Sequence, residues 1–291
     1  MYSSIKVINL VNNKEINIES NVDQNGIVCT KFLDSQPKGI FEKIKGLNQI
    51  GQSINSATLS EREIVIEGII IGENLMQVEI FKSELVYIFN PVQDVLLKYN
   101  DENIEKEIIV RATSIPIFSD EVNTNNLRKF IITLSADYPL WMDQKENNIN
   151  IETWESNFEF PFCIESEGIE LARKGPNQIE IINNGQMKAP LEIYFKAPAL
   201  NPKIILNNNE YIKVNKKIND GEILYICTAY GKKRVEIIKE NGLRENAYGY
   251  IDIFSKFFSL PVGNNIISYS TDGDFIPQTV IVKYKNQFLS L

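Results

Sequence analysis

The sequence predicts a mainly β protein of two domains that contains one long α-helix. Three observations lead to this fold class. Short runs in which apolar and polar side chains alternate recur along the chain, and this is the period of a β-strand. A single stretch in the first half has the period of a helix instead. A polar stretch without periodicity separates the two halves, and 291 residues suffice for two domains of ordinary size.

The first half begins with a predicted β-hairpin. Residues 5–10 and 15–18 alternate with period two, and residues 11–14 between them supply turn-forming residues. The same kind of pattern predicts five more strands, at residues 62–71, 95–99, 107–112, 115–118 and 129–134. We therefore expect an N-terminal domain that resembles a β-barrel or β-sandwich.

One segment, residues 73–89, breaks this β pattern. Its apolar residues are spaced three or four apart and form one stripe on a helix, made of Leu75, Val78, Phe81, Leu85 and Ile88. Glu73 suits the positive end of the helix dipole. Pro91 stops the helix, because the residue before a proline avoids the helical region. We expect the whole stripe to be buried against a sheet.

A domain boundary is predicted at residues 143–148, which are polar and aperiodic. It separates an N-terminal domain of residues 1–142 from a C-terminal domain of residues 150–291. The second half has no helical stripe, and Asn, Gly and Pro separate its short strands, at residues 179–185, 190–195, 203–206, 222–227, 265–270 and 279–284. Short strands at this spacing favour a β-sandwich.

Composition excludes several classes of function. The net charge of −8 and the pI of about 4.9 argue against binding to nucleic acid or to anionic membranes, which requires clustered Lys and Arg. The chain contains no histidine. Ser-His-Asp and Cys-His catalysis and histidine-dependent zinc sites are thereby excluded.

Candidate binding motifs are also incomplete. Cys29, Cys163 and Cys227 are far apart and form no CxxC pair, so neither a zinc site nor a disulfide framework is indicated. Residues 231–233 lack the glycine spacing of a phosphate-binding loop. Residues 272–274 lack the ligand spacing of a calcium loop. The sequence predicts no catalytic, cofactor-binding or metal-binding residue, no cofactor and no enzyme activity.

Targeting signals are absent from the sequence as given. The first residues lack the basic and apolar regions of a signal peptide, and apolar runs such as residues 69–71 are too short to span a bilayer. We expect synthesis in the cytoplasm and no membrane insertion. Trp141 and Trp154, the two tryptophans, flank the predicted boundary, and we expect them to pack between the domains.

Motifs in both halves follow a recognisable order. The first half has an Arg-x-Ile-x-Ile-x-Gly strand at residues 62–68, followed by the helix, which ends in Asn-Pro at residues 90–91. A hairpin comes next, then a Pro-x-Phe element at residues 116–118 and a closing Asp-Tyr-Pro-Leu-Trp segment at residues 137–141. The second half continues with characteristic segments at residues 183–185, 189–193, 201–204, 221–226 and 258–269. Over nearly its whole length the chain resembles the distal tail (Dit) proteins of siphophages.

The resemblance implies a structural role at the virion tail tip, without catalytic residues. Members of the family form a six-fold ring between the tail tube and the tail-associated lysin or tip protein. They also anchor receptor-binding proteins, and DNA only passes through the channel. The N-terminal domain would build the ring, and the C-terminal domain would be a galectin-like β-sandwich facing outward. This chain has no room for the carbohydrate-binding modules that enlarged members carry.

Two other functions remain open on the sequence. The first is a carbohydrate-binding β-sandwich adhesin of a phage tail or a cell surface, which aromatic residues on a concave face of the second domain would favour. The second is the N-terminal fragment of a tail-tip hydrolase. The lack of histidine and of a visible acid–base arrangement disfavours that reading, although the 38 acidic residues make nearby carboxylate pairs inevitable.

Overall fold

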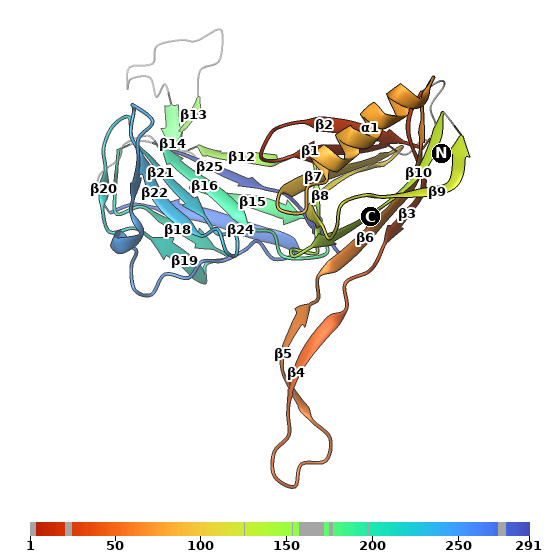
Figure 1. The fold of residues 1–291 in the computed structure, drawn as a ribbon. Coiled ribbons are helices and arrows are strands. Elements are labelled where there is room, and N and C mark those ends of the chain that lie inside the picture. The colour runs from red at the N-terminus through yellow and green to blue at the C-terminus, as the bar shows by residue number, and fades with distance from the viewer. Residues whose placement is uncertain are drawn as a thin grey trace. The chain divides into compact units, whose positions relative to one another are not determined.

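The computed structural model describes residues 4–20, 25–124, 126–152, 154–156, 172–174, 177–196, 198–272 and 278–291 (Figure 1). The chain divides into two compact units. Unit 1 comprises residues 1–144 and 288–291, and unit 2 comprises residues 145–287. Residues 288–291, which the sequence analysis places in the second domain of residues 150–291, belong to unit 1. Hydrophobic periodicity shows where a strand forms, but not that the chain returns to a unit it has already left.

Unit 1 is built around a closed sheet. Its strand order is β8-β7-β1-β2-β3-β6-β10, and β10 pairs back to β8 through Leu134↔Ala112 and Ser135↔Arg111, which makes a seven-stranded barrel. The strand bounds are β1 Ser4–Asn9, β2 Glu15–Glu19, β3 Gly26–Asp34, β6 Arg62–Ile71, β7 Asp94–Asp101, β8 Ile104–Ala112 and β10 Leu127–Ala136. Closure removes free strand edges from the body of the barrel.

Three more strands extend this sheet. They are β9 (Ile117–Thr124) on β10, β11 (Trp141–Asp143) on β8, and β26 (Gln287–Phe288) on β11. The alternating strands fill the barrel with one buried apolar cluster, which includes Val7, Ile66, Leu97, Val110 and Ile132. Unit 1 also contains a separate two-stranded sheet of β4 (Gly39–Ile44) and β5 (Ser53–Leu59).

The one α-helix of the described chain is α1 (Leu75–Ile88), which packs against β6, β1 and β2. Asn74 caps it, because its side-chain oxygen accepts a hydrogen bond from the Gln77 amide at 3.0 Å. Val78, Leu85 and Ile88 are fully buried as expected. The expectation for the start of the stripe is wrong, since Leu75 is 48% exposed. Periodicity identifies the face of a helix that packs, but not how far along the helix its partner sheet extends.

Unit 2 is a β-sandwich of two antiparallel sheets. One sheet has the order β12-β25-β16-β21-β22-β23 and the other the order β15-β24-β18-β19. The larger sheet consists of β12 Asn147–Glu152, β25 Thr279–Tyr284, β16 Leu191–Lys196, β21 Ile223–Cys227, β22 Arg234–Ile238 and β23 Arg244–Asn246. The smaller sheet consists of β15 Gln178–Asn183, β24 Gly263–Ser270, β18 Lys203–Leu206 and β19 Glu210–Lys213.

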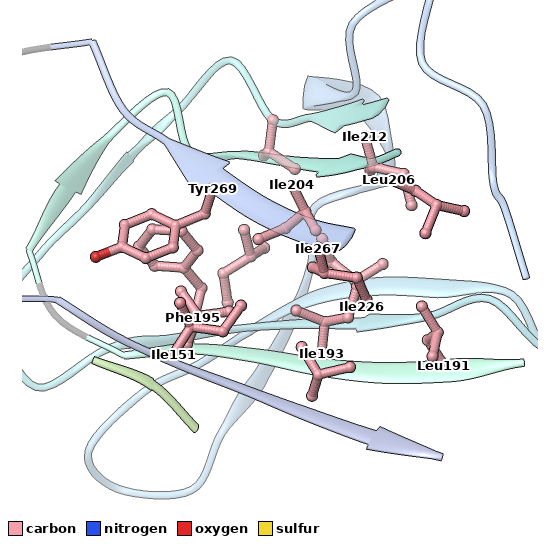
Figure 2. Close-up of a cluster of buried hydrophobic side chains, with 14 of the residues drawn as sticks. Ile151, Leu191, Ile193, Phe195, Ile204, Leu206, Ile212, Ile226, Ile267 and Tyr269 are labelled. Atoms are coloured by element: carbon pink, nitrogen blue, oxygen red, sulfur yellow. The ribbon is translucent and has the colours of Figure 1, made fainter. Parts of the chain in front are cut away.

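The core of unit 2 lies between these sheets. Figure 2 shows Ile193, Phe195 and Ile226 of the larger sheet facing Ile204 and Ile267 of the smaller one. Short elements complete the described part of the unit, namely β13 Trp154–Ser156, β14 Ala172–Lys174, β17 Ala199–Leu200, β20 Lys217–Ile218 and the 3-10 helix Tyr248–Tyr250. The predicted mainly β fold, with a barrel-like first domain, one helix and a following sandwich, is confirmed.

No helix among the described residues is long and apolar enough to cross a membrane.

Candidate assembly surface

The most exposed element of unit 1 is the hairpin of residues 39–59, here called the arm. It extends the ribbon of β3 and β6 and projects away from the barrel (Figure 1). Its polar contacts are largely local: Ser56 Oγ donates to Glu42 at 2.9 Å, and Gln49 Nε2 donates to Ser53 Oγ at 2.9 Å. No arm residue belongs to the buried cluster that the described residues of unit 1 form.

Large apolar side chains of the arm face solvent. Leu47 and Ile50 at its tip are 97% and 101% exposed. The others, each more than half exposed, are Ile40, Phe41, Ile44 and Ile54. An isolated two-stranded hairpin is marginally stable in water, and exposed large apolar side chains concentrated on one element favour an interaction site. The arm therefore has the properties of a surface that is covered in an assembly.

A buried polar cluster, here called the base node, fixes the foot of the arm. Asp34 ends the strand that leads into the arm and Arg62 starts the strand that leaves it. The wholly buried Arg62 guanidinium donates to Asp34 Oδ1, to the carbonyl of Pro139 at 2.8 Å and to the carbonyl of Leu289. Trp141 Nε1 donates to Asp34 Oδ2 at 3.0 Å. The two strands that carry the arm are thus held together by groups distant in sequence.

The base node corrects the sequence interpretation of the tryptophans. Trp141 does not pack between the domains, because it is fully buried within the core of unit 1. The side chain of Trp154 lies outside the described residues. The node also explains the motifs at residues 62 and 137–141, since they meet around Asp34. Sequence reasoning found these motifs without finding their contact, because the contact spans up to 227 residues.

Close packing explains why position 68 is a glycine. A Cβ at this position would lie 2.3 Å from the Val28 carbonyl oxygen and 2.3 Å from Cζ of Phe130. Opposite Gly68, the pairing between β3 and β6 shifts register between Cys29 and Lys31. The glycine therefore lets β3 and the Phe130 ring approach the middle of β6 closely.

The sequence-predicted chemical candidates do not gather into a site. Cys29 is half-buried and Cys227 is buried; both are free cysteines, and burial raises the pKa of the Cys29 thiol. Residues 231–233 form part of an exposed turn between β21 and β22. Cys163 lies outside the described residues, as do residues 273–274. Within the described residues, no three Cys, Asp or Glu side chains form a group that could hold a metal ion.

The outer face of the larger sheet of unit 2 carries two aromatic rings. Tyr194 and Tyr225 lie 5.0 Å apart, but Arg244 lies over the Tyr225 ring at 5.4 Å and Lys283 over the Tyr194 ring at 5.5 Å. Burial, and next the nearby Glu192 carboxylate, raise the pKa of Tyr194 to about 12. These rings are covered by cationic side chains and do not present an open stacking platform for a sugar.

Acidic charge is concentrated in unit 1. Unit 1 contains 20 acidic and 13 basic residues, a net charge of −7, whereas unit 2 contains 18 and 17, a net charge of −1. The unit that carries the arm is therefore also the unit that repels polyanions.

Comparison with known proteins agrees with this architecture. Residues 5–136 match the phage tail protein RIFT-related domain, and residues 184–288 match the siphovirus-type tail component, C-terminal domain, of the SPP1 Dit family. The chain is thus a tail component of siphovirus type. More specifically, it belongs to the Dit family of distal tail proteins and is a component of the phage tail tip or baseplate.

Solved structures share the fold at low sequence identity. The crystal structure of SPP1 Dit (gp 19.1) aligns with a TM-score of 0.63 at 14% identity, covering 97% of this chain and 98% of that one. A chain of the phage P2 baseplate in its activated conformation with Ca aligns with a TM-score of 0.56 at 12% identity, covering 98% of both chains. No curated protein sequence matches the chain.

Proposed function

We propose that this protein is a non-enzymatic hub that forms a closed ring of six copies in the tail tip. Unit 1 builds the ring, which joins the tail tube to the tail-associated lysin or tip protein, and unit 2 supports receptor-binding proteins. The exposed apolar arm is the observation that carries this proposal. The solved SPP1 relative is described as a paradigm of a hub adsorption apparatus, and the P2 relative comes from a baseplate.

The arm suits a ring because it lies apart from the barrel that carries it. A contact in which the arm of one copy meets a different surface of the next copy is head-to-tail, and such contacts close into a ring when the rotation between copies permits. The arm offers both apolar side chains and unpaired strand edges to the neighbouring copy. Burying its six large apolar side chains would stabilise the contact by several kcal/mol, at roughly 25 cal/mol per Å².

The charge distribution supports a conduit for DNA. A ring domain with a net charge of −7 does not collect the Lys and Arg side chains that hold phosphates. DNA can then pass without being retained. Weak binding to double-stranded DNA, even at low salt, is the corresponding expectation.

Arm variants of the full chain test the proposal. We expect Ile40→Ser, Phe41→Ser and Ile44→Ser, combined in one chain, to convert rings into monomers in which both units stay folded, since these side chains are exposed and belong to neither buried core. The matched control replaces exposed apolar residues of unit 2, with Tyr230→Ser, Ile253→Ser and Phe254→Ser, and should leave the ring intact. Sedimentation velocity separates the two species. A triple arm variant that forms rings as well as the unaltered chain would refute the role of the arm.

A further inference from the structure

Residues 288–291, here called the clasp, belong to unit 1 although all of unit 2 precedes them in the sequence. The Ser290 carbonyl accepts a hydrogen bond from Lys106 Nζ at 2.9 Å, and the same ammonium group lies 4.0 Å from the centre of the Phe288 ring. Phe288 and Leu291 pack against the buried cluster of the barrel. The clasp is thus bound by its backbone and by its side chains.

The clasp also completes the base node of the arm. Arg62 is wholly buried and obtains its acceptors from Asp34, Pro139 and Leu289. A buried guanidinium that loses one acceptor retains an unsatisfied N–H group, which is costly in a dry interior. Since Asp34 and Arg62 start and finish the segment that contains the arm, the Leu289 carbonyl helps to fix the foot of the arm.

We propose that docking of the clasp switches unit 1 into its assembly-competent form, so that ring formation waits until unit 2 has been made. This inference rests on the proposed ring function. On a nascent chain, unit 1 would be complete in sequence except for the clasp while unit 2 is translated, which takes roughly 10–30 s at ordinary synthesis rates. During this time the base node lacks the Leu289 carbonyl, and the arm is not yet fixed for contact with a second copy.

The experiment uses the full chain with Trp154→Phe, which leaves Trp141 of the base node as the one tryptophan. This parent is compared with a variant that lacks residues 288–291. We expect the deletion to shift Trp141 emission to longer wavelength and to lower the ring fraction at least about tenfold, the size typical of one lost hydrogen bond to a buried charge. A synthetic peptide of residues 285–291 should restore both the emission and the rings.

Controls separate docking from general destabilisation. A peptide of the same composition in scrambled order should restore nothing. Lys106→Met in the deleted chain should weaken binding of the restoring peptide about tenfold, because it removes the donor to Ser290. Lys31→Met, which removes a surface charge paired with Glu67, should not weaken it.

The outcomes distinguish this inference from the ring proposal. If the deleted chain forms rings as efficiently as its parent, or if saturating peptide restores neither emission nor assembly, the clasp has no switching role. If the undeleted parent never forms rings, the proposed function fails. The Trp141 emission then still reports whether the clasp completes the base node.

Discussion

Units 1 and 2 differ in where they place their apolar side chains. Unit 1 closes its main sheet into a barrel, yet extends an arm whose edges and apolar side chains face solvent. Unit 2 buries its apolar side chains between two stacked sheets and is formed by one continuous segment. Because unit 1 closes its main sheet, its fold can remove free strand edges. The exposed edges of the arm are therefore not a general property of this unit. In the proposed ring, the arm is the surface that meets another copy.

The two units also differ in how they are completed. Unit 1 needs residues from both ends of the described chain, whereas unit 2 lies between them. We expect unit 2 to unfold as an autonomous sandwich and unit 1 to depend on distant contacts around Arg62. The following changes test this difference, from the largest expected effect to the smallest.

Phe195→Ala should destabilise unit 2 by about 3–5 kcal/mol, because the ring is fully buried and packs edge-on against Tyr269. If the units unfold separately, hydrogen exchange should accelerate in the strands of unit 2 and stay unchanged in the barrel. The exposed Ile253→Ala serves as the control and should change stability by less than about 0.5 kcal/mol. Equal acceleration in both units would show that they unfold as one.

Leu85→Ala should destabilise unit 1 by about 2–5 kcal/mol, because this side chain is on the buried face of the helix and is fully buried. Leu75→Ala on the same helix makes the matched control, since Leu75 is half exposed and its loss should cost less than about 1 kcal/mol. Urea denaturation in the Trp154→Phe background, followed by Trp141 fluorescence, measures both. Similar losses for the two variants would contradict the helix orientation in the structure.

Asn74→Ala should destabilise unit 1 by about 1 kcal/mol, because the Gln77 amide at the start of the helix loses its acceptor. Asn74→Ser should recover most of that loss, since serine caps helices nearly as well. The same denaturation measurement applies. A serine variant as unstable as the alanine variant would mean that the cap hydrogen bond is not what stabilises this end.

Acidification should weaken unit 2 through three surface carboxylates. Hydrogen bonds from Lys216 and Lys239 lower the pKa of Glu245, the Phe254 amide chiefly lowers that of Asp252, and Lys213 chiefly lowers that of Asp272. A carboxyl whose pKa is lower in the folded than in the unfolded state stabilises the folded protein at pH values above its unfolded pKa, which is near 4. That stability is lost as the pH falls through the folded pKa.

The melting temperature of unit 2 should therefore fall as the pH drops below about 4.5. Glu245→Gln should flatten this dependence, because the glutamine side chain does not titrate. Calorimetric scans between pH 7 and pH 3 measure the slope. If the glutamine variant shows the same dependence of melting temperature on pH, Glu245 does not contribute to it.

The sequence alone predicts those elements in which one face is buried and the other is exposed. The strand at residues 62–71 alternates because one side is buried in the barrel, and the helix at residues 75–88 shows its stripe for the same reason. The arm was missed because both of its faces are exposed, so nothing imposes alternation on residues 39–44 or 53–59. Strand β3 was missed as well, and its register shift at Cys29 disrupts the period-two pattern.

The base node shows a second limit of sequence reasoning. Arg62 and Trp141 belong to motifs that were found from sequence, yet their shared partner Asp34 and the Leu289 carbonyl were not. A backbone carbonyl leaves no trace in residue type. The contact also depends on the closure of the barrel, which local periodicity does not reveal.

The number of copies in the assembly tests the central claim most directly. Native mass spectrometry of the full chain should show a species of about 200 kDa, six times the 33.3 kDa chain, formed without added partners or metal. The triple arm variant should appear at the mass of one chain under the same conditions. A full chain that stays monomeric at high concentration and in the presence of neighbouring tail proteins would contradict the ring.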